Sequence, residues 1–223
     1  MKKVGLPLLI LLMGALYIFV VPSEPHAVKL LFKLVPMWLV IAYAYVRMPT
    51  PWKSAHWLLL TGLFFCMLGD GLLGWFVVGL SAFLVGHLFY LASFWREHRP
   101  SRLRSAAIVP IACFAVYMGW ELVHALARDD KHALVFPVLL YIAVISLMAW
   151  SAIRTGKTWA IVGGLLFLAS DAILSWNLFV SDVAYAGVLI MTTYYVAQFC
   201  IAHSIRTTAA PTPIPKGAAR LPS

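Results

Sequence analysis

The chain contains eight apolar runs of about 18 to 22 residues, separated by short polar segments. A helix rises 1.5 Å per residue and the hydrocarbon core of a bilayer is about 30 Å thick, so about 20 apolar residues suffice to cross it. The predicted spans are Val4–Val21, Val28–Val46, His56–Leu73, Trp75–Trp95, Ser105–His124, Ala133–Ile153, Thr158–Phe179 and Val183–Ser204. The pattern therefore predicts an all-α membrane protein with about eight transmembrane helices.

Composition supports a lipid environment. Of the 223 residues 63% are hydrophobic and only 11% are charged, whereas a soluble domain carries roughly 25% charged residues. The net charge of +9 could suggest a nucleic-acid partner, but the basic residues occupy short loops between apolar runs, which is typical of membrane orientation instead. The three cysteines are scattered singly in apolar stretches, so we expect free buried thiols and neither a metal site nor a cofactor.

The distribution of lysine and arginine predicts the orientation of the helices. Four of these residues, Lys29, Lys33, Arg128 and Lys131, fall on one predicted side of the membrane. The other thirteen fall on the opposite side: Lys2, Lys3, Arg47, Lys53, Arg96, Arg99, Arg102, Arg104, Arg154, Lys157, Arg206, Lys216 and Arg220. Short cytoplasmic loops carry an excess of positive charge, so both termini are predicted to be cytoplasmic.

An internal repeat divides the apolar region. Gly69–Trp75 matches Ser170–Trp176 at an offset of 101 residues, and Pro36 and Pro137 share that offset. Two matches in register suggest a four-plus-four duplication. Four is an even number of spans, so the two halves would have the same orientation, related by an axis along the membrane normal.

The predicted domain organisation is simple. Residues 1–205 form one transmembrane domain with halves at about 1–98 and 104–205, and the Pro-rich segment 206–223 is expected to be a disordered cytoplasmic tail. Val4–Val21 after two lysines resembles a secretory signal, but the run is long and no A-x-A site follows. We therefore expect a retained helix.

The repeated motifs each place an aspartate, Asp70 or Asp171, inside an apolar run. An ionisable residue inside the hydrocarbon costs about 2.5–3.5 kcal/mol on insertion scales, so it indicates function or a specific polar partner. Counting along the runs places both in the outer half of the membrane, where desolvation would leave them partly or wholly protonated. The structural alternative is that each aspartate only joins neighbouring helices by hydrogen bonds.

Further polar residues occur at a similar depth and are candidates for substrate binding. They are Lys33, His87, Tyr90, Asn177, Tyr194, Tyr195 and Gln198. Spacings of three and four place His87 with Tyr90 on one helix face, and Tyr194 with Gln198 on another. Structural alternatives stay open for each: a lysine that extends to the interface, a hydrogen-bonded core histidine, and helix-to-helix hydrogen bonds.

Five motifs resemble those of the lysoplasmalogenase family, also called YhhN-like, in the family's order and across roughly residues 28–204. They are Phe32-Lys33-Leu34-Val35-Pro36, Leu68-Gly69-Asp70, Gly86-His87-Leu88-Phe89-Tyr90, Ser170-Asp171 and Thr193-Tyr194-Tyr195-Val196-Ala197-Gln198. The resemblance implies an eight-helix fold that hydrolyses the vinyl ether bond of lysoplasmalogens to a fatty aldehyde and a glycerophospho-ethanolamine or -choline. It also implies that Asp70 and Asp171 are the catalytic pair and that the partner is an alkenyl lysophospholipid.

The chemistry of vinyl ethers fits two carboxyl groups. Protonation of the β-carbon gives an oxocarbenium ion, which needs an acid, a nearby anion and an activated water. Our hypothesis makes Asp70 the acid and Asp171 the base, with the reverse assignment also open, while Lys33 and the tyrosines hold the phosphate headgroup or water. The alternatives are a small proton-coupled transporter and a non-catalytic lipid-binding protein.

The cellular location is predicted from the loops. They are short, and no N-x-S/T acceptor occurs in the sequence. This suits a bacterial inner membrane, with the endoplasmic reticulum left open. The sequence makes no prediction about the oligomeric state.

Overall fold

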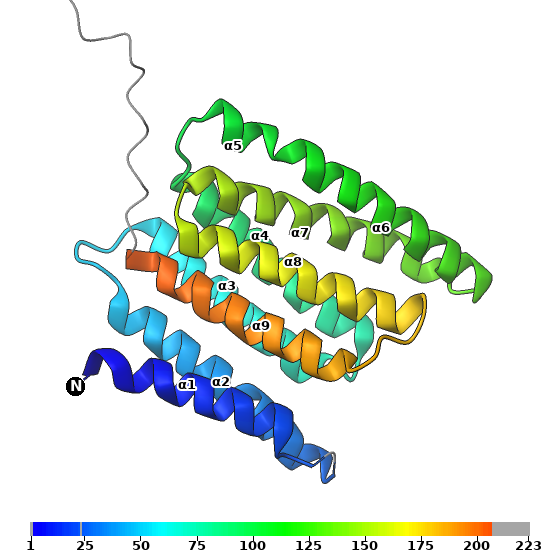
Figure 1. Cartoon of the computed structure of the whole chain (residues 1–223), viewed down its shortest axis with the longest axis horizontal. Helices are drawn as coiled ribbons and strands as arrows, with labels where there is room; N and C mark the ends of the chain where they lie inside the picture. The colour runs from blue at the N-terminus through cyan, green and yellow to red at the C-terminus, as the bar shows by residue number, and fades with distance from the viewer. Residues whose placement is uncertain (1, 23, 207–223) are drawn as a thin grey trace, which may run out of the picture.

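The protein is a bundle of antiparallel helices (Figure 1). A computed structural model describes residues 2–22 and 24–206, so the predicted disordered tail lies, from residue 207 on, outside the described residues. The long helices are α1 (Lys2–Phe19), α2 (His26–Arg47), α3 (Ser54–Leu72), α4 (Phe76–Arg96), α6 (Ile108–Arg128), α7 (Val135–Thr155), α8 (Thr158–Phe179) and α9 (Ala186–His203). Short helices α5 (Arg102–Ala106), η1 (His132–Leu134) and η2 (Ser204–Arg206) complete the described chain, which contains no strand.

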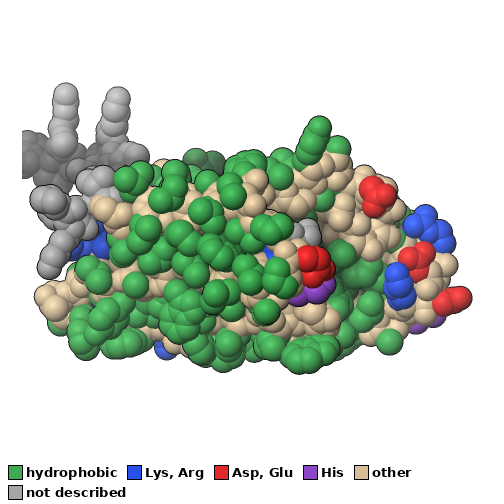
Figure 2. Space-filling view, turned by 90° about the horizontal axis from the view of Figure 1, so that it is seen from below, with side chains coloured by type: hydrophobic (Ala, Val, Ile, Leu, Met, Phe, Trp, Pro, Cys, Tyr) green, Lys and Arg blue, Asp and Glu red, His purple; other side chains and the backbone are tan. Residues whose placement is uncertain are grey.

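The long helices confirm the prediction of an all-α membrane protein. Seven are long and apolar enough to cross a membrane, and Gly5–Phe19 of α1 forms a shorter apolar helix. Large apolar side chains such as Val46, Val116 and Phe136 are more than 70% exposed. Figure 2 shows hydrophobic side chains covering most of one face, with the acidic side chains in view lying toward its right-hand end. An apolar outer surface of this extent needs lipid as its solvent, so the protein is a multi-pass integral membrane protein.

Helix bounds follow the predicted runs closely. Thr158–Phe179 was predicted with the bounds that α8 has, and the largest difference concerns the run predicted at Ser105–His124, where α5 and α6 replace one helix. The break lies at Ala107. Pro110 has no N–H to donate to the carbonyl of Ala106, and its ring crowds that carbonyl. The predicted helix is therefore interrupted between α5 and α6. Ser101 starts α5 by accepting the backbone N–H of Arg104.

Similar helix neighbours recur in the two predicted halves. α1 packs on α2 and α2 on α3, just as α6 packs on α7 and α7 on α8. The most closely packed pairs are α3 with α4 and α8 with α9. A Cβ on Gly62 would lie 3.0 Å from the carbonyl oxygen of Gly86, and a Cβ on Gly163 would lie 3.0 Å from that of Ala197. These two glycines share the 101-residue offset, which a duplication would explain; the duplication itself stays a prediction.

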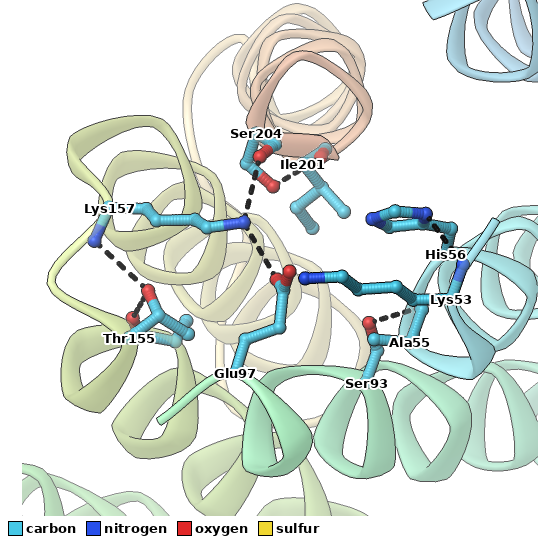
Figure 3. A network of polar contacts seen from close by, with 10 residues as sticks. Lys53, Ala55, His56, Ser93, Glu97, Thr155, Lys157, Ile201 and Ser204 are labelled. Atoms are coloured by element: carbon cyan, nitrogen blue, oxygen red, sulfur yellow. Dashed lines mark hydrogen bonds and ion pairs between the residues drawn. The ribbon is translucent and has the colours of Figure 1, made fainter. Parts of the chain in front are cut away.

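One end of the bundle, which we call the basic end, is formed where α2, α4, α7 and α9 finish and α3, α5 and α8 begin (left in Figure 1). A polar network ties these helices together there (Figure 3). Lys157 Nζ lies 2.8 Å from Glu97 Oε2 and donates to the Ser204 carbonyl at 3.3 Å. Ser93 Oγ donates to the Ala55 carbonyl at 2.7 Å. These contacts fix the basic end, opposite the half of the bundle that contains the candidate site.

Candidate active site

A cavity of about 290 Å³ lies among the long helices, in the half of the bundle away from the basic end. Asp70 of α3 and Asp171 of α8 both line it, together with Lys33 of α2, Tyr141 of α7 and Tyr194 of α9. Most of its other lining residues are apolar. The cavity therefore brings the two predicted aspartates to one largely apolar chamber within the membrane-spanning part of the protein.

Asp70 lies in the last turn of α3 and is held by groups from two other helices. Lys33 Nζ is 3.1 Å from Asp70 Oδ1 and 3.4 Å from the Asp70 carbonyl oxygen. Tyr194 OH donates to Asp70 Oδ2 at 2.6 Å. The side chain of Asp70 is only 4% exposed and that of Lys33 is 16% exposed. A buried carboxylate requires such a cation and donor because its own hydration has been removed.

Asp171 has a different set of partners. Its Oδ2 accepts a short hydrogen bond from Tyr141 OH, and His87 Nε2 lies 3.0 Å from the same hydroxyl and 3.6 Å from Asp171 Oδ2. Because Tyr141 donates its proton to Asp171, its oxygen is free to accept from His87 Nε2–H. His87 is completely buried, and its Nδ1 has no hydrogen-bond partner among the described residues. A chain from His87 through Tyr141 to Asp171 thus orients this carboxyl group.

The two carboxyl groups therefore share one feature and differ in another. Each accepts a hydrogen bond from a tyrosine on a different helix, Tyr194 for Asp70 and Tyr141 for Asp171. Only Asp70 has a lysine or arginine within ion-pair distance among the described residues. Asp171 is also more accessible, with 14% of its side chain exposed.

Three other predicted site residues support the cavity from outside its lining. Tyr195 OH donates to the carbonyl of Lys33 at 2.8 Å, which fixes α2 against α9. Tyr90 OH donates to Gln198 Oε1 at 2.6 Å, and Gln198 Nε2 has no partner among the described residues. Their buried hydroxyl and amide groups join helices, and their role in substrate binding stays a prediction.

Asn177 lies apart from the cavity lining. Its Oδ1 accepts the backbone N–H of Val183 at 3.0 Å. This bond fixes the segment between α8 and α9, so the structure places Asn177 near the C-terminal end of α8, where it holds that segment, rather than among the groups that line the cavity.

The sequence interpretation missed Tyr141. Unlike the tyrosines that were selected, it has no polar residue three or four positions away in its apolar run, so it gave no sign of its own. Its depth was nevertheless readable: Tyr141 is six residues from the start of α7, and Asp171 is eight from the end of α8. Comparing depths across antiparallel helices would have placed the two near one level.

Comparison with known proteins agrees with these motifs. Residues 28–205 match the YhhN family. Mouse lysoplasmalogenase TMEM86B is 30% identical over 183 residues, which cover 80% of this chain and 76% of the mouse protein. Human lysoplasmalogenase TMEM86A is 32% identical over 203 residues, covering 82% of this chain and 80% of the human protein.

A bacterial relative matches a shorter part. A lysoplasmalogenase of Mycobacterium bovis is 32% identical over 161 residues, which cover 67% of this chain and 60% of that protein. No solved structure matches the chain. Because the match to the family extends over all helices from the second to the last, the chain belongs to the YhhN family.

Proposed function

We propose that this protein is an ether hydrolase that cleaves the vinyl ether bond of lysoplasmalogens, releasing a fatty aldehyde and a glycerophospho-ethanolamine or -choline. The observation that carries the proposal is the position of Asp70 and Asp171 on one apolar cavity. The names of the relatives support this class of substrate. A largely apolar chamber within the membrane-spanning part suits the alkenyl chain, and two carboxyl groups suit its acid-labile bond.

The reaction needs three proton movements. An acid transfers a proton to the β-carbon of the vinyl ether, and the former double bond becomes an oxocarbenium ion. Water adds to the cationic carbon and loses a proton to a base, giving a hemiacetal. The hemiacetal then transfers its hydroxyl proton to the departing glycerol oxygen, so that the aldehyde and the free alcohol separate. A pair of carboxyl groups can supply the acid, the base and the stabilising anion.

The contacts favour the reverse of our first assignment of roles. Asp70 is the anionic partner of the Lys33 ammonium at 3.1 Å, so we assign it to stabilise the oxocarbenium ion and to receive the proton of water. Asp171 accepts a hydrogen bond from Tyr141 at Oδ2, which leaves its Oδ1 to carry the proton that is transferred to the substrate. We therefore assign Asp171 as the acid, oriented by Tyr141. Lys33, held by Asp70, sets the charge of that carboxylate and is not assigned to the phosphate.

For the membrane, we propose that the basic end faces the cytoplasm of a bacterial cell. The proposal is supported by the excess of lysine and arginine in the segments at this end. Both termini would then be cytoplasmic, and the cavity would lie in the outer half of the bilayer.

The proposed reaction is tested with purified protein in detergent, run in D₂O. The substrates are a 1-alkenyl, a 1-alkyl and a 1-acyl lysophosphoethanolamine, and the aldehyde is reduced at once with borohydride to prevent exchange. We expect product from the alkenyl lipid alone, with one deuterium on the carbon next to the former carbonyl, because only the vinyl ether has a carbon that can be protonated. Release from the 1-acyl lipid, or alkenyl cleavage without deuterium at that carbon, would exclude the mechanism.

A further inference from the structure

A second hollow lies at the basic end, between α4 and α7 and away from the aspartate cavity. Its apolar walls are Leu88, Leu91 and Ala92 of α4 and Leu147 of α7. Trp95, Arg96 and Trp150 line the same groove. Leu88 and Leu147 are exposed, so the groove faces the lipid side of the bundle. An apolar trough that ends at tryptophans and an arginine has the layout of a site for one lipid chain and its headgroup.

A second guanidinium lies beside this groove. The Arg154 Cζ atom is 4.7 Å from the ring centroids of both Trp95 and Trp150. The two rings lie 6.0 Å apart, and Trp150 is held in place by donating its indole N–H to the Ser105 carbonyl at 3.1 Å. The aromatic rings therefore position Arg154 by cation–π contacts. Its Nε is buried without a hydrogen-bond partner among the described residues.

The positive charge of Arg96 beside the groove is not neutralised by the adjacent Glu97. Glu97 follows Arg96 directly, but its carboxylate is engaged by Lys157 Nζ at 2.8 Å (Figure 3). Arg104 lies against Gly156 at the end of α7, and its Nη1 also has no partner among the described residues. Arg154 thus has donor capacity that the described part of the protein leaves unused, next to an apolar trough.

We propose that this groove binds an anionic phospholipid, with one acyl chain along α4 and α7 and the phosphate against Arg96 and Arg154. A guanidinium suits a phosphate because it presents parallel N–H donors. The apolar walls exclude a soluble phosphate ester as the preferred occupant, since such a molecule would leave the trough empty. The site lies at the opposite end of the bundle from Asp70 and Asp171, and its binding does not depend on the proposed reaction.

Native mass spectrometry of the purified full-length protein in detergent tests the site. Dioleoyl phosphatidylglycerol and dioleoyl phosphatidylcholine are titrated separately, and the dissociation constant of the first bound lipid is measured. We expect clearly tighter binding of phosphatidylglycerol. A basic residue near a charged headgroup contributes about 1 kcal/mol, or about fivefold in affinity, so Arg96→Ala and Arg154→Ala should each weaken phosphatidylglycerol binding about fivefold.

Two matched variants separate the contributions. Arg128→Ala removes an exposed arginine at the other end of the bundle and should leave binding unchanged, whereas Ala92→Trp fills the trough and should weaken binding of phosphatidylglycerol. Arg96 is exposed, so its variant reports on binding even if Arg154→Ala fails to fold. Equal affinity for both lipids, unchanged binding in Arg96→Ala, unchanged binding in Ala92→Trp, or displacement of the lipid by 10 mM glycerol 3-phosphate would each overturn the proposal.

Discussion

Replacing Lys33 by methionine removes the cation from Asp70 and leaves the carboxylate buried with only a tyrosine donor. The two side chains are 16% and 4% exposed and 3.1 Å apart at their charged atoms. Breaking a buried ion pair on one side costs about 3–5 kcal/mol. Because Lys33 is partly exposed, we take the lower figure, about 3 kcal/mol. For a protein of this size this corresponds to a fall in Tm of about 6–12 °C.

The double variant Lys33→Met with Asp70→Asn is the informative comparison. It removes both charges, and the amide can still accept from Tyr194, so no uncompensated charge stays buried. We expect it to recover most of the lost stability, with a coupling free energy of about 2 kcal/mol between the two sites. It should nevertheless be inactive, because the proposed anion is gone.

Thermal unfolding of the two single variants and the double variant, in one detergent at one pH and followed by tryptophan fluorescence, measures this coupling. The same preparations are assayed for aldehyde release. If the decreases in unfolding free energy of the two single variants add in the double variant, to within about 0.5 kcal/mol, the ion pair does not stabilise the fold. The reasoning about the environment of Asp70 would then be wrong.

Two further changes test the cavity and its packing. Tyr141→Phe removes the hydroxyl that donates to Asp171. The carboxyl group becomes charged as it gives up its proton, and a hydrogen bond to a charged group contributes about 1.5–3 kcal/mol, so kcat should fall about 10- to 100-fold; an unchanged kcat contradicts the orienting role. Gly62→Ala places a Cβ 2.5 Å from the ring of Tyr90 and should cost about 1–3 kcal/mol, read as a lower Tm. Gly74→Ala, with no neighbour within 4 Å, is the matched control, and equal Tm values in the two variants would refute the packing argument.

The sequence predicted the helices well because the bilayer sets their length. Runs of about 20 apolar residues map directly onto spans, so the bounds of α8 were predicted to the residue. The break at Ala107 depends on a local rule, since Pro110 cannot donate to the Ala106 carbonyl. The sequence interpretation missed this break because it relied on hydropathy. The apolar run continues through Ala107, and hydropathy alone does not register the lost hydrogen bond.

The two carboxyl groups were the most readable part of the site, because the sequence carried charge there. A lone aspartate in an apolar run stands out, and the repeated motif placed two of them on related helices. Partner choice was not readable, because it depends on how helices far apart in the chain pack. His87 and Tyr90 lie on one helix face, yet His87 contacts Tyr141 while Tyr90 donates to Gln198.

The most direct measurement is aldehyde release from 1-alkenyl lysophosphoethanolamine by the wild type, Asp70→Asn, Asp171→Asn and Asp182→Asn. The last is the matched control, because Asp182 is exposed in the segment between α8 and α9. Loss of a general acid or base lowers the rate about 100- to 10,000-fold. We expect such a loss in kcat for both cavity variants, each eluting as a folded monodisperse protein, and wild-type activity for Asp182→Asn. A folded Asp70→Asn or Asp171→Asn variant with wild-type kcat would contradict the proposal that the two carboxyl groups act together on the substrate.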